Sequence, residues 1–394
     1  MCHTPYYVIH KDELDNSLRN LQNALRTHWG NYIIGYSYKT NALPWIISYF
    51  NQMGCFAEVV SEDERKLSEF IHVPKDHVIY NGPIKTKKSF LESLICGAYV
   101  NLDSYREIEW LDELPAGEYN LGLRVNFDIE SKCPNQSQCG SEGGRFGFCL
   151  ENGEFGAALS RIKSKGFTPK GLHLHVSSKT RSIDIYREIA KIACQVAEDY
   201  RMDLSFIDIG GGFFGGLKGK PTFDDYFREV SSILKNYFSP GNVKLIVEPG
   251  MALIGSPVSY VTSVIDVKDT TFNRFVVTDG SRTHIDPLMT KKNYFHQLQT
   301  IGERTTRDHQ IICGYTCMEH DRLMKLSNEQ ELKVGDKIIY EKVGAYTMCL
   351  TPLFIKYYPD VYIQEAGGLR IVRNAWHVQE YAQNSILFDG NGAR

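Results

Sequence analysis

Two patterns of hydrophobic and polar residues divide the chain near residue 255. Before that point, short runs of β-branched and aromatic residues recur at intervals of roughly 20–45 residues, and segments with helical periodicity separate them. The runs predict strands at 32–39, 55–60, 77–82, 99–104, 121–126, 171–176, 205–210 and 244–250. Eight strands that alternate with helices predict an α/β fold, a closed (β/α)₈ TIM-like barrel whose working residues lie at the C-terminal strand ends.

Beyond residue 255 the pattern becomes alternation without intervening helices. Residues 258–267 and 273–279 alternate, and 333–346 holds a Val-Gly-Asp turn followed by another apolar run. These features predict an antiparallel β domain. Residues 6–9, one helix (12–26) before the barrel, are expected to pair into it.

The domain boundaries follow from these two patterns. We predict a barrel domain at 27–255, and a second domain made of residues 1–26 together with 256–394. Helices are expected between the barrel strands, for example at 61–70, which has an N-cap and an acidic first turn, and at 183–200.

Composition narrows the function classes. The chain has 394 residues, 42% hydrophobic and 23% charged, with a formal net charge of −3, so neither a nucleic-acid surface nor a polybasic membrane patch is expected. No leader or membrane span is expected, and the ten cysteines lack a paired framework. They are expected to be free thiols in the cytoplasm. Cys133, Cys139 and Cys149 cluster without a Cys-x-x-Cys pair, so no metal is expected there.

Unusual residues gather at the predicted C-terminal strand ends. Lys39 ends the first strand, although an ammonium is costly to desolvate, and a lysine amine that forms a Schiff base is one chemistry that needs this placement. His173 and His175 share a strand face, three glycines (210–212) end the seventh strand, and Glu248 ends the eighth. Each has an ordinary explanation by itself: a surface lysine, a turn, a core histidine or a solvated acid. Together they provide an amine, an anion cradle, a ring stacker and a carboxylate, the parts needed to hold pyridoxal phosphate.

Further motifs occur in order along nearly the whole chain. They are Tyr36-Ser-Tyr-Lys39-Thr-Asn41, Glu58, Asn81-Gly-Pro-Ile-Lys85, Asn101-Leu-Asp-Ser104, Arg145-Phe-Gly147, His173-Leu-His-Val-Ser-Ser178, Phe206-Ile-Asp-Ile-Gly-Gly-Gly212, Glu248-Pro-Gly250, Cys317-x-x-x-Asp321 and Gly344-Ala-Tyr346. In this order they resemble the motifs of the alanine-racemase-fold (fold type III) pyridoxal-phosphate decarboxylases, the group of diaminopimelate, ornithine and arginine decarboxylases. Ser177 replaces the glycine that this family has in its histidine motif.

The resemblance implies roles for particular residues. Lys39 is expected to carry the cofactor, His175 to stack on its ring, Glu248 to face the ring nitrogen and Cys317 to donate the proton. The expected cofactor-binding residues are Lys39, Glu58, His175, Ser178, Asp208, Gly210, Gly211, Gly212, Glu248, Gly250, Met251 and Tyr346. The expected substrate residues are Arg145, Asp286, Met318, Glu319 and Asp321. The resemblance also implies a homodimer whose active sites are shared between subunits.

Departures from the family bear on the substrate. Diaminopimelate decarboxylases resemble this chain but carry arginine at the position of Met251, Arg-Pro at Asp286-Pro287, tyrosine at Thr290 and an acid at Met318. The groups that would hold a distal carboxylate are therefore replaced. We expect an α-decarboxylase that acts on a basic, amide-bearing or conjugated amino acid in a specialised biosynthetic pathway, and not on meso-diaminopimelate.

Three alternative functions are open. A racemase or epimerase of the same fold would place an arginine against the ring nitrogen, where this chain has Glu248. A metal-dependent barrel hydrolase would use His173, His175 and Asp208 as ligands, but such barrels carry the histidine pair on the first strand. A cofactor carrier without activity would not need a β domain with Cys317.

Overall fold

The computed structural model describes residues 3–388, which form two compact units. One unit comprises residues 15–256, and the other combines the residues up to 14 with those from 257 onward. No helix among the described residues has the length and apolar content needed to cross a membrane.

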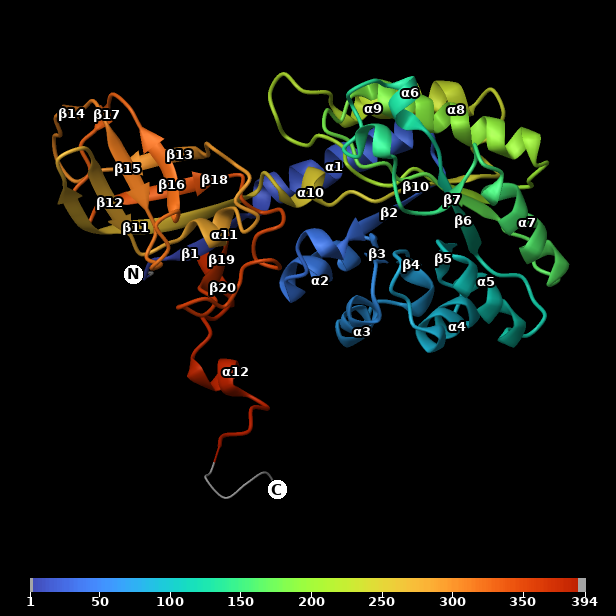
Figure 1. Ribbon diagram of the computed structural model, residues 1–394, viewed down its shortest axis with the longest axis horizontal. Coiled ribbons are helices and arrows are strands. Elements are labelled where there is room, and N and C mark those ends of the chain that lie inside the picture. The colour runs from blue at the N-terminus through green and yellow to red at the C-terminus, as the bar shows by residue number, and fades with distance from the viewer. Residues whose placement is uncertain (1–2, 389–394) are drawn as a thin grey trace. The chain divides into compact units, whose positions relative to one another are not determined.

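The first unit is built on a closed parallel barrel (Figure 1). Its strands pair in parallel, and the barrel closes because the fourth strand pairs with the fifth and the eighth with the first. The strands are β2 (Tyr32–Ser37), β3 (Phe56–Val59), β4 (Val78–Tyr80), β5 (Tyr99–Leu102), β6 (Leu121–Asn126), β8 (Gly171–His173), β9 (Phe206–Asp208) and β10 (Lys244–Val247). The predicted barrel is confirmed. A two-residue strand, β7 (Phe148–Cys149), adds to β6 and was not predicted.

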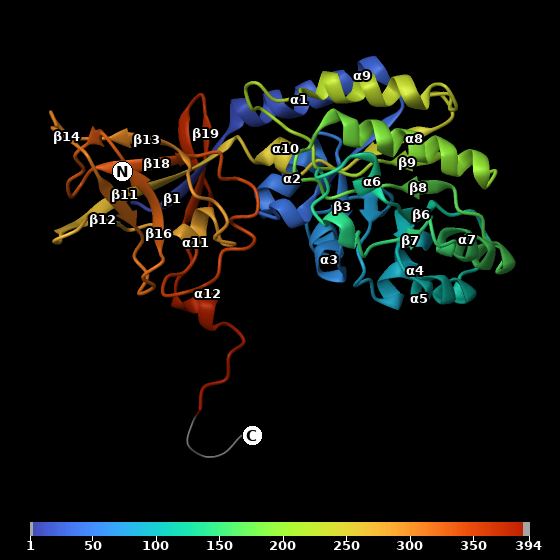
Figure 2. The same cartoon turned by 45° about the horizontal axis from the view of Figure 1, so that its top comes forward.

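Helices alternate with these strands. They are α1 (Lys11–His28), α2 (Pro44–Gln52), α3 (Glu62–Phe70), α4 (Lys87–Ile95), α5 (Tyr105–Trp110), α6 (Ile129–Lys132), α7 (Glu154–Ser164), α8 (Ile183–Asp199), α9 (Phe223–Leu234) and α10 (Met251–Ile254). Side-chain oxygens cap several N-termini: Ser61 accepts from Glu64 N, Ser182 from Ile185 N, and Thr222 forms a capping box with Asp225. Helices α8 and α9 lie side by side (Figure 2).

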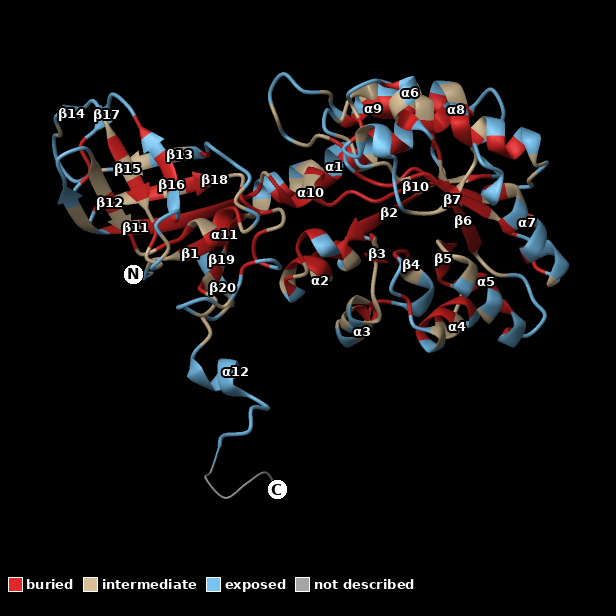
Figure 3. Ribbon diagram, viewed as in Figure 1, coloured by how far each residue is buried: buried red, intermediate tan, exposed pale blue. Residues whose placement is uncertain are grey.

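Burial follows the hydrophobic pattern. The barrel strands are buried along their lengths, and the helices bury only one side (Figure 3). Inside the barrel, Ile33, Ile79, Tyr99, Phe206 and Ile246 form a packed layer. A Cβ at position 171 would lie 2.1 Å from the Phe206 ring, so β8 must begin with glycine for this ring to fit. Apolar side chains fill the barrel interior, and its polar groups lie at the strand ends.

The second unit contains a nine-stranded sheet. Its strands are β1 (Tyr6–His10), β11 (Val258–Asp269), β12 (Arg274–Thr278), β13 (Phe295–Gln299), β15 (Gln310–Cys313), β16 (Arg322–Leu326), β18 (Lys337–Glu341), β19 (Asp360–Glu365) and β20 (Gly368–Arg373). The short strands β14 (Thr306–Arg307) and β17 (Glu329–Gln330) pair separately, and α11 (Arg282–Ile285) and α12 (Val378–Ala382) are the helices after residue 257.

The expectation of an antiparallel domain needs correction, because the sheet is mixed. Strand β1 pairs antiparallel with β11, as residues 6–9 were expected to do, but it runs parallel to β19. Strand β12 runs parallel to β15. Both parallel pairs join strands that no short hairpin connects, so alternation along the chain did not constrain their direction.

Candidate active site

Lys39 lies beyond the strand on which it was predicted. Strand β2 ends at Ser37, and Lys39 sits in the following 3₁₀ turn, η1 (Tyr38–Thr40). Its Nζ donates to Glu58 Oε2 at 3.1 Å, and Ser37 Oγ donates to the same oxygen at 2.5 Å. The Glu58 side chain is fully buried at the end of β3, whereas that of Lys39 is 40% exposed. The ammonium is thus held by a buried carboxylate yet remains open to a ligand.

Two asparagines connect this pair to the opposite side of the barrel. Asn81 Nδ2 donates to Glu58 Oε1 at 3.0 Å and to Glu248 Oε1 at 2.5 Å. Asn101 Nδ2 donates to Asn81 Oδ1 at 2.8 Å and to Asp208 Oδ2 at 3.4 Å. Both asparagines are buried at strand ends. Neither was predicted as a site residue, although a polar amide at the end of an apolar strand is a usable signal.

Asp208, Glu248 and His173 form the buried polar floor of the site. One ligand atom from each lies within 4.8 Å of the others, and His173 Nε2 is 3.5 Å from Glu248 Oε2. Burial and the charge of Glu248 raise the pKa of Asp208 well above its usual value. Burial also opposes ionisation of Glu248, but His173 and Lys39 outweigh it and hold the Glu248 pKa well below its usual value. The floor therefore couples two carboxyl groups whose pKa values are displaced in opposite directions.

The glycine run orients His175. Gly211 N donates to His175 Nδ1 at 3.2 Å, so the ring proton of the neutral imidazole sits on Nε2. Gly210 has φ of 67° and donates its N–H to Asp208 Oδ1 at 2.9 Å; a Cβ here would lie 2.4 Å from His175 Nδ1. Burial, and secondarily Lys39, lower the pKa of His175 to about 3. The loop thus presents a neutral aromatic ring beside the floor.

The other predicted cofactor residues lie on neighbouring loops. Gly250 packs against the Lys39 turn so closely that a Cβ would lie 2.0 Å from Thr40 Oγ1, and Met251 opens α10 directly after it. Ser178 is partly buried beyond His175, where its Oγ accepts from Arg181 N at 2.8 Å. Its hydroxyl is therefore already used to shape the loop that precedes α8.

Arg124 was also missed. It is buried on β6, 3.6 Å from Asp103 Oδ2, and its guanidinium stacks over Phe146. Arg145, which was predicted, stacks over the same ring at 4.0 Å and is exposed. Arg124, Arg145 and His175 line one pocket of about 360 Å³, together with Glu142. The pocket provides side-chain space next to the polar floor.

The predicted residues of the β unit divide into two kinds. Cys317 and Glu319 are exposed, and Met318 and Tyr346 are partly buried. Asp286 and Asp321 are buried, and their carboxylates bond within their own unit. Both oxygens of each acid accept hydrogen bonds within the unit, which argues against the substrate role expected for them.

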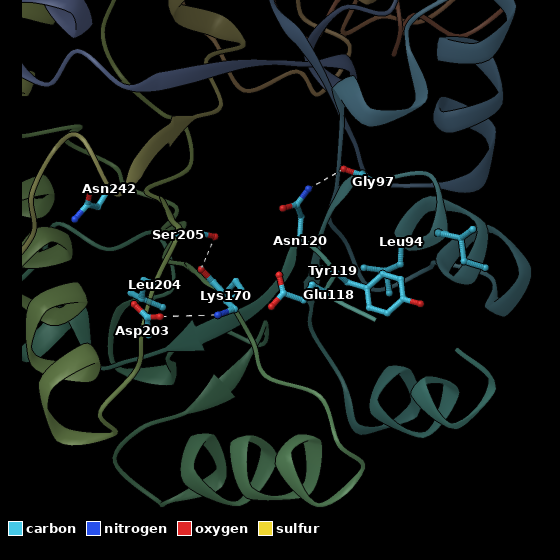
Figure 4. Close-up of a pocket in the computed structure, with 11 residues that line it drawn as sticks. Leu94, Gly97, Glu118, Tyr119, Asn120, Lys170, Asp203, Leu204, Ser205 and Asn242 are labelled. Carbon is cyan, nitrogen blue, oxygen red and sulfur yellow. Dashed lines mark hydrogen bonds and ion pairs between the residues drawn. The ribbon is translucent and has the colours of Figure 1, made fainter. Parts of the chain in front are cut away.

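A second pocket lies at the opposite end of the barrel strands (Figure 4). Its volume is about 650 Å³, and residues that line it, such as Asn120, Lys170 and Ser205, immediately precede β6, β8 and β9. Lys170 lies 3.9 Å from Asp203, and Asn120 donates to Gly97 O. The lining is open and internally paired, and it contains none of the predicted site residues.

The donor set at the active end fits an organic cation better than a metal ion. The ligand set expected for a hydrolase included His175, but His175 is outside the group of potential metal ligands found among the described residues. Glu248 is a buried carboxylate that accepts a hydrogen bond from the neutral Asn81, and neither ring nitrogen of His173 has a hydrogen-bond partner among the described residues. A protonated ring nitrogen would complement this carboxylate, and the Lys39 amine would complement an aldehyde.

A parallel barrel joined to a mixed sheet unit, with a lysine and buried acids at the strand ends, defines the alanine-racemase-fold class of pyridoxal-phosphate enzymes. The family model described as "Pyridoxal-dependent decarboxylase, pyridoxal binding domain" matches residues 12–255, more than half of the 394 residues. The chain belongs to the pyridoxal-dependent decarboxylase family, and its cofactor is pyridoxal phosphate.

Individual relatives agree over almost the whole length. The chain is 23% identical over 384 residues to diaminopimelate decarboxylase of Aquifex aeolicus, which covers 94% of this chain and 89% of the relative. The structure of diaminopimelate decarboxylase from M. jannaschii matches with a TM-score of 0.85 at 22% identity, covering 99% and 93% of the two chains. The arginine decarboxylase of Paramecium bursaria Chlorella virus matches with a TM-score of 0.76 at 20% identity, covering 92% and 96%. At these identities the structural matches establish the fold.

Proposed function

We propose that this chain removes the α-carboxylate of an amino acid and replaces it with a proton. The observation that carries the proposal is Glu248, an ionised carboxylate in the buried floor where a racemase of this fold would carry an arginine. When bound, pyridoxal phosphate supplies an electron sink for the electrons released from the carbon–carboxylate bond. A carboxylate that keeps the ring nitrogen protonated strengthens that sink, whereas an arginine would weaken it.

Each group in the barrel has a defined task in this proposal. The Lys39 amine holds the aldehyde carbon, and Glu58 keeps the amine in place through the 3.1 Å contact. Glu248 would lie against the ring nitrogen, and the neutral ring of His175 would stack on the cofactor. The N–H groups of Gly212, Gly250 and Met251 are the proposed phosphate donors.

Cys317 is the proposed proton donor. Its thiol is exposed on the loop between β15 and β16, so it is available to a substrate. The Sγ–H bond breaks as the proton moves to the α-carbon, and the thiolate that remains takes a proton from water before the next turnover.

The proposed substrate lacks a distal carboxylate. Arg282, the arginine nearest to the altered Asp286-Pro287 segment, is held by Asp286 at 3.0 Å and by Lys291 O at 2.7 Å. Met251, Thr290 and Met318 offer no cation. A carboxylate brought to this region would have to break the Arg282–Asp286 pair, at a cost of several kcal/mol for an unpaired buried charge. We therefore favour a basic, amide-bearing or conjugated amino acid, with Glu319 as the remaining exposed acid.

The test is a panel of D- and L-amino acids that includes meso-diaminopimelate, arginine, lysine and ornithine. Released carbon dioxide identifies the substrate, and a change of configuration without carbon dioxide would identify a racemase instead. The kcat/KM for meso-diaminopimelate should be at least about 100-fold below that of the best substrate, which corresponds to about 2.7 kcal/mol. Equal values would refute the proposed specificity.

The active form in this proposal is a homodimer with shared sites. Lys39 and Glu248 belong to one compact unit, and Cys317 and Tyr346 belong to the other. In the resembling family the barrel of one subunit meets the β domain of its partner. Mixing Lys39→Ala with Cys317→Ala subunits should then restore about a quarter of wild-type activity, because half of the dimers are mixed and each has one intact site. No recovery after demonstrated subunit exchange would exclude shared sites.

A further inference from the structure

The loop that carries Cys317 is organised by one buried carboxylate. Residues 314–321 connect β15 to β16, and Cys317 lies exposed near the middle of the loop. Asp321, at the end of the loop, is only 2% exposed. A carboxylate buried to this extent must have its oxygens hydrogen-bonded or it would destabilise the fold.

Asp321 receives four hydrogen bonds from two separate segments. Its Oδ1 accepts from Ser281 Oγ at 3.1 Å and from Arg282 N at 2.9 Å, at the start of α11. Its Oδ2 accepts from Thr316 N at 3.2 Å and from Thr316 Oγ1 at 2.7 Å, next to Cys317. The side chain therefore ties the cysteine loop to the N-terminus of α11.

The backbone closes around this carboxylate. Asp321 N donates to Met318 O at 2.9 Å, and Gly314 N donates to Asp321 O at 2.9 Å. A Cβ at position 314 would lie 2.2 Å from Asp321 Oδ2. The loop leaves no room for another side chain at the carboxylate, and little freedom for Thr316 and Met318, which flank Cys317.

We propose that Asp321 is a positioning residue that fixes the loop so that the Cys317 thiol is presented outward for proton transfer. This replaces the substrate-binding role expected from the sequence, because a carboxylate has about four acceptor sites and all four are used. An asparagine would turn an NH₂ group toward donors on one side, leaving them unpaired. The inference rests on the proposed role of Cys317.

The first experiment measures loop geometry independently of activity. Native holoenzyme is treated briefly with iodoacetamide, and the tryptic peptide 308–322 is analysed, because it contains both Cys313 and Cys317. Cys313 is an internal reference: it is partly buried, and burial raises its pKa to about 11. In the wild type Cys317 should be labelled preferentially. In Asp321→Asn the Cys317/Cys313 ratio should fall at least about fivefold, because the loosened loop uncovers Cys313.

Two further variants bracket this result. Thr316→Val removes one of the four donors and should shift the ratio in the same direction by less, and it serves if Asp321→Asn fails to fold. Asp308→Asn makes the same chemical change at an exposed position of the same peptide and should leave the ratio unchanged. An unchanged ratio in both Asp321→Asn and Thr316→Val would overturn the inference.

The second experiment separates positioning from general damage. Asp321→Asn should lower kcat at least about tenfold and change KM less than about twofold, because the affected step is proton transfer. The double variant Asp321→Asn/Cys317→Ala should be no slower than Cys317→Ala, since both changes disable one function. Additive losses would show a merely structural role and refute the proposal. If Cys317→Ala keeps wild-type kcat, the proton-donor assignment fails, and the labelling ratio alone then decides the positioning role.

Discussion

Two groups of buried acids, one in each unit of this protein, are satisfied in opposite ways. In the β unit, Asp286 accepts from Arg282, from Thr290 N and Lys291 N, and from Tyr294 OH, and Asp321 is equally saturated. In the barrel unit, the pKa of Asp208 is raised and that of Glu248 is lowered, and both ring nitrogens of the adjacent His173 have no hydrogen-bond partner among the described residues. Asp286 and Asp321 therefore form a closed cluster, in which the acceptor sites are occupied. Asp208, Glu248 and His173 form an open cluster, which still offers charge and hydrogen-bonding atoms.

This difference separates acids that build the fold from acids that serve a ligand. A native protein rarely leaves buried polar atoms unpaired without a reason, so we propose the open cluster as the cofactor position. The same reasoning reassigns the aspartates of the β unit, which their sequence motif had placed among the substrate residues. Substitutions should therefore affect function in the open cluster and stability in the closed one.

The largest effect is expected for Lys39→Ala. Loss of the amine should lower kcat/KM by about 10³-fold or more, and the cofactor should no longer be fixed to the protein by borohydride. Mass spectrometry of the peptide that contains residue 39 checks the attachment. The control is Lys66→Ala, which removes a lysine exposed on α3 and paired with Glu62. A pyridoxyl adduct on a different lysine in the wild type would contradict the assignment.

The next largest effect is expected for Glu248→Gln. This change keeps the size of the side chain and removes the charge that faces the ring nitrogen, so kcat should fall by about 10²–10³-fold. Asp208→Asn is the matched variant: because burial and Glu248 raise the pKa of Asp208, replacing it with a neutral amide should cost clearly less. Steady-state kinetics on both proteins decide the point. An equal loss in the two variants would mean that the charge does not reside on Glu248.

A substitution in the closed cluster should lower the free energy of unfolding. Asp286→Ala leaves Arg282 and several backbone donors unpaired, and we expect a loss of about 3 kcal/mol in the free energy of unfolding, the lower end for a broken buried pair because Arg282 is 17% exposed. The holoenzyme should retain its cofactor content. Denaturant unfolding followed by fluorescence and by cofactor absorbance measures both. A raised KM at unchanged stability would restore Asp286 to the substrate residues.

The barrel could be predicted from sequence because each of its strands is a local hydrophobic run bounded by helices. Even in the barrel the predicted strands extend too far at their C-terminal ends. The strand predicted at 32–39 ends at Ser37, because the backbone turns into η1 and places Lys39 beyond the last hydrogen bond of the sheet. The sheet of the second unit was less predictable. The parallel pairing of β1 with β19 joins the two ends of the chain, and no local pattern encodes such a contact.

The site, like the fold, could be predicted only in part from the sequence. Recognisable sequence motifs contain Lys39, Glu58, His175 and Glu248. The structure gathers these four residues at the strand ends. Asn81 was missed because its importance lies in bridging two carboxylates from different strands, which is visible only in three dimensions. The substrate role predicted for Asp286 and Asp321 stays a prediction, and the hydrogen bonds that their carboxylates accept argue against it. A motif shows that an acid is present, but it does not show that all of its acceptor sites are occupied.

The smallest expected effect tests whether the perturbed electrostatics of the open cluster extend to Glu64. Glu64 lies partly buried on α3, where its Oε2 accepts from Val60 N at 2.8 Å. Burial, and secondarily the charge of Glu58, raise its pKa to about 7 from 4.5, against the opposing effects of the Val60 hydrogen bond and Lys39. The folded protein therefore binds this proton more tightly than the unfolded chain. The stability that Glu64 contributes is fully present below pH 4.5 and is lost as the pH rises through 7.

Glu64→Gln cannot titrate and keeps an acceptor for Val60 N. The unfolding free energy of wild type minus that of the variant should therefore fall between pH 4.5 and pH 8, by about 1–2 kcal/mol after allowance for partial solvent access. Denaturant unfolding of both proteins at several pH values measures this difference. Glu118→Gln, at an exposed position, should show a flat difference over the same range. A flat difference for Glu64→Gln as well would confine the perturbed electrostatics to the floor of the barrel, around Asp208 and Glu248.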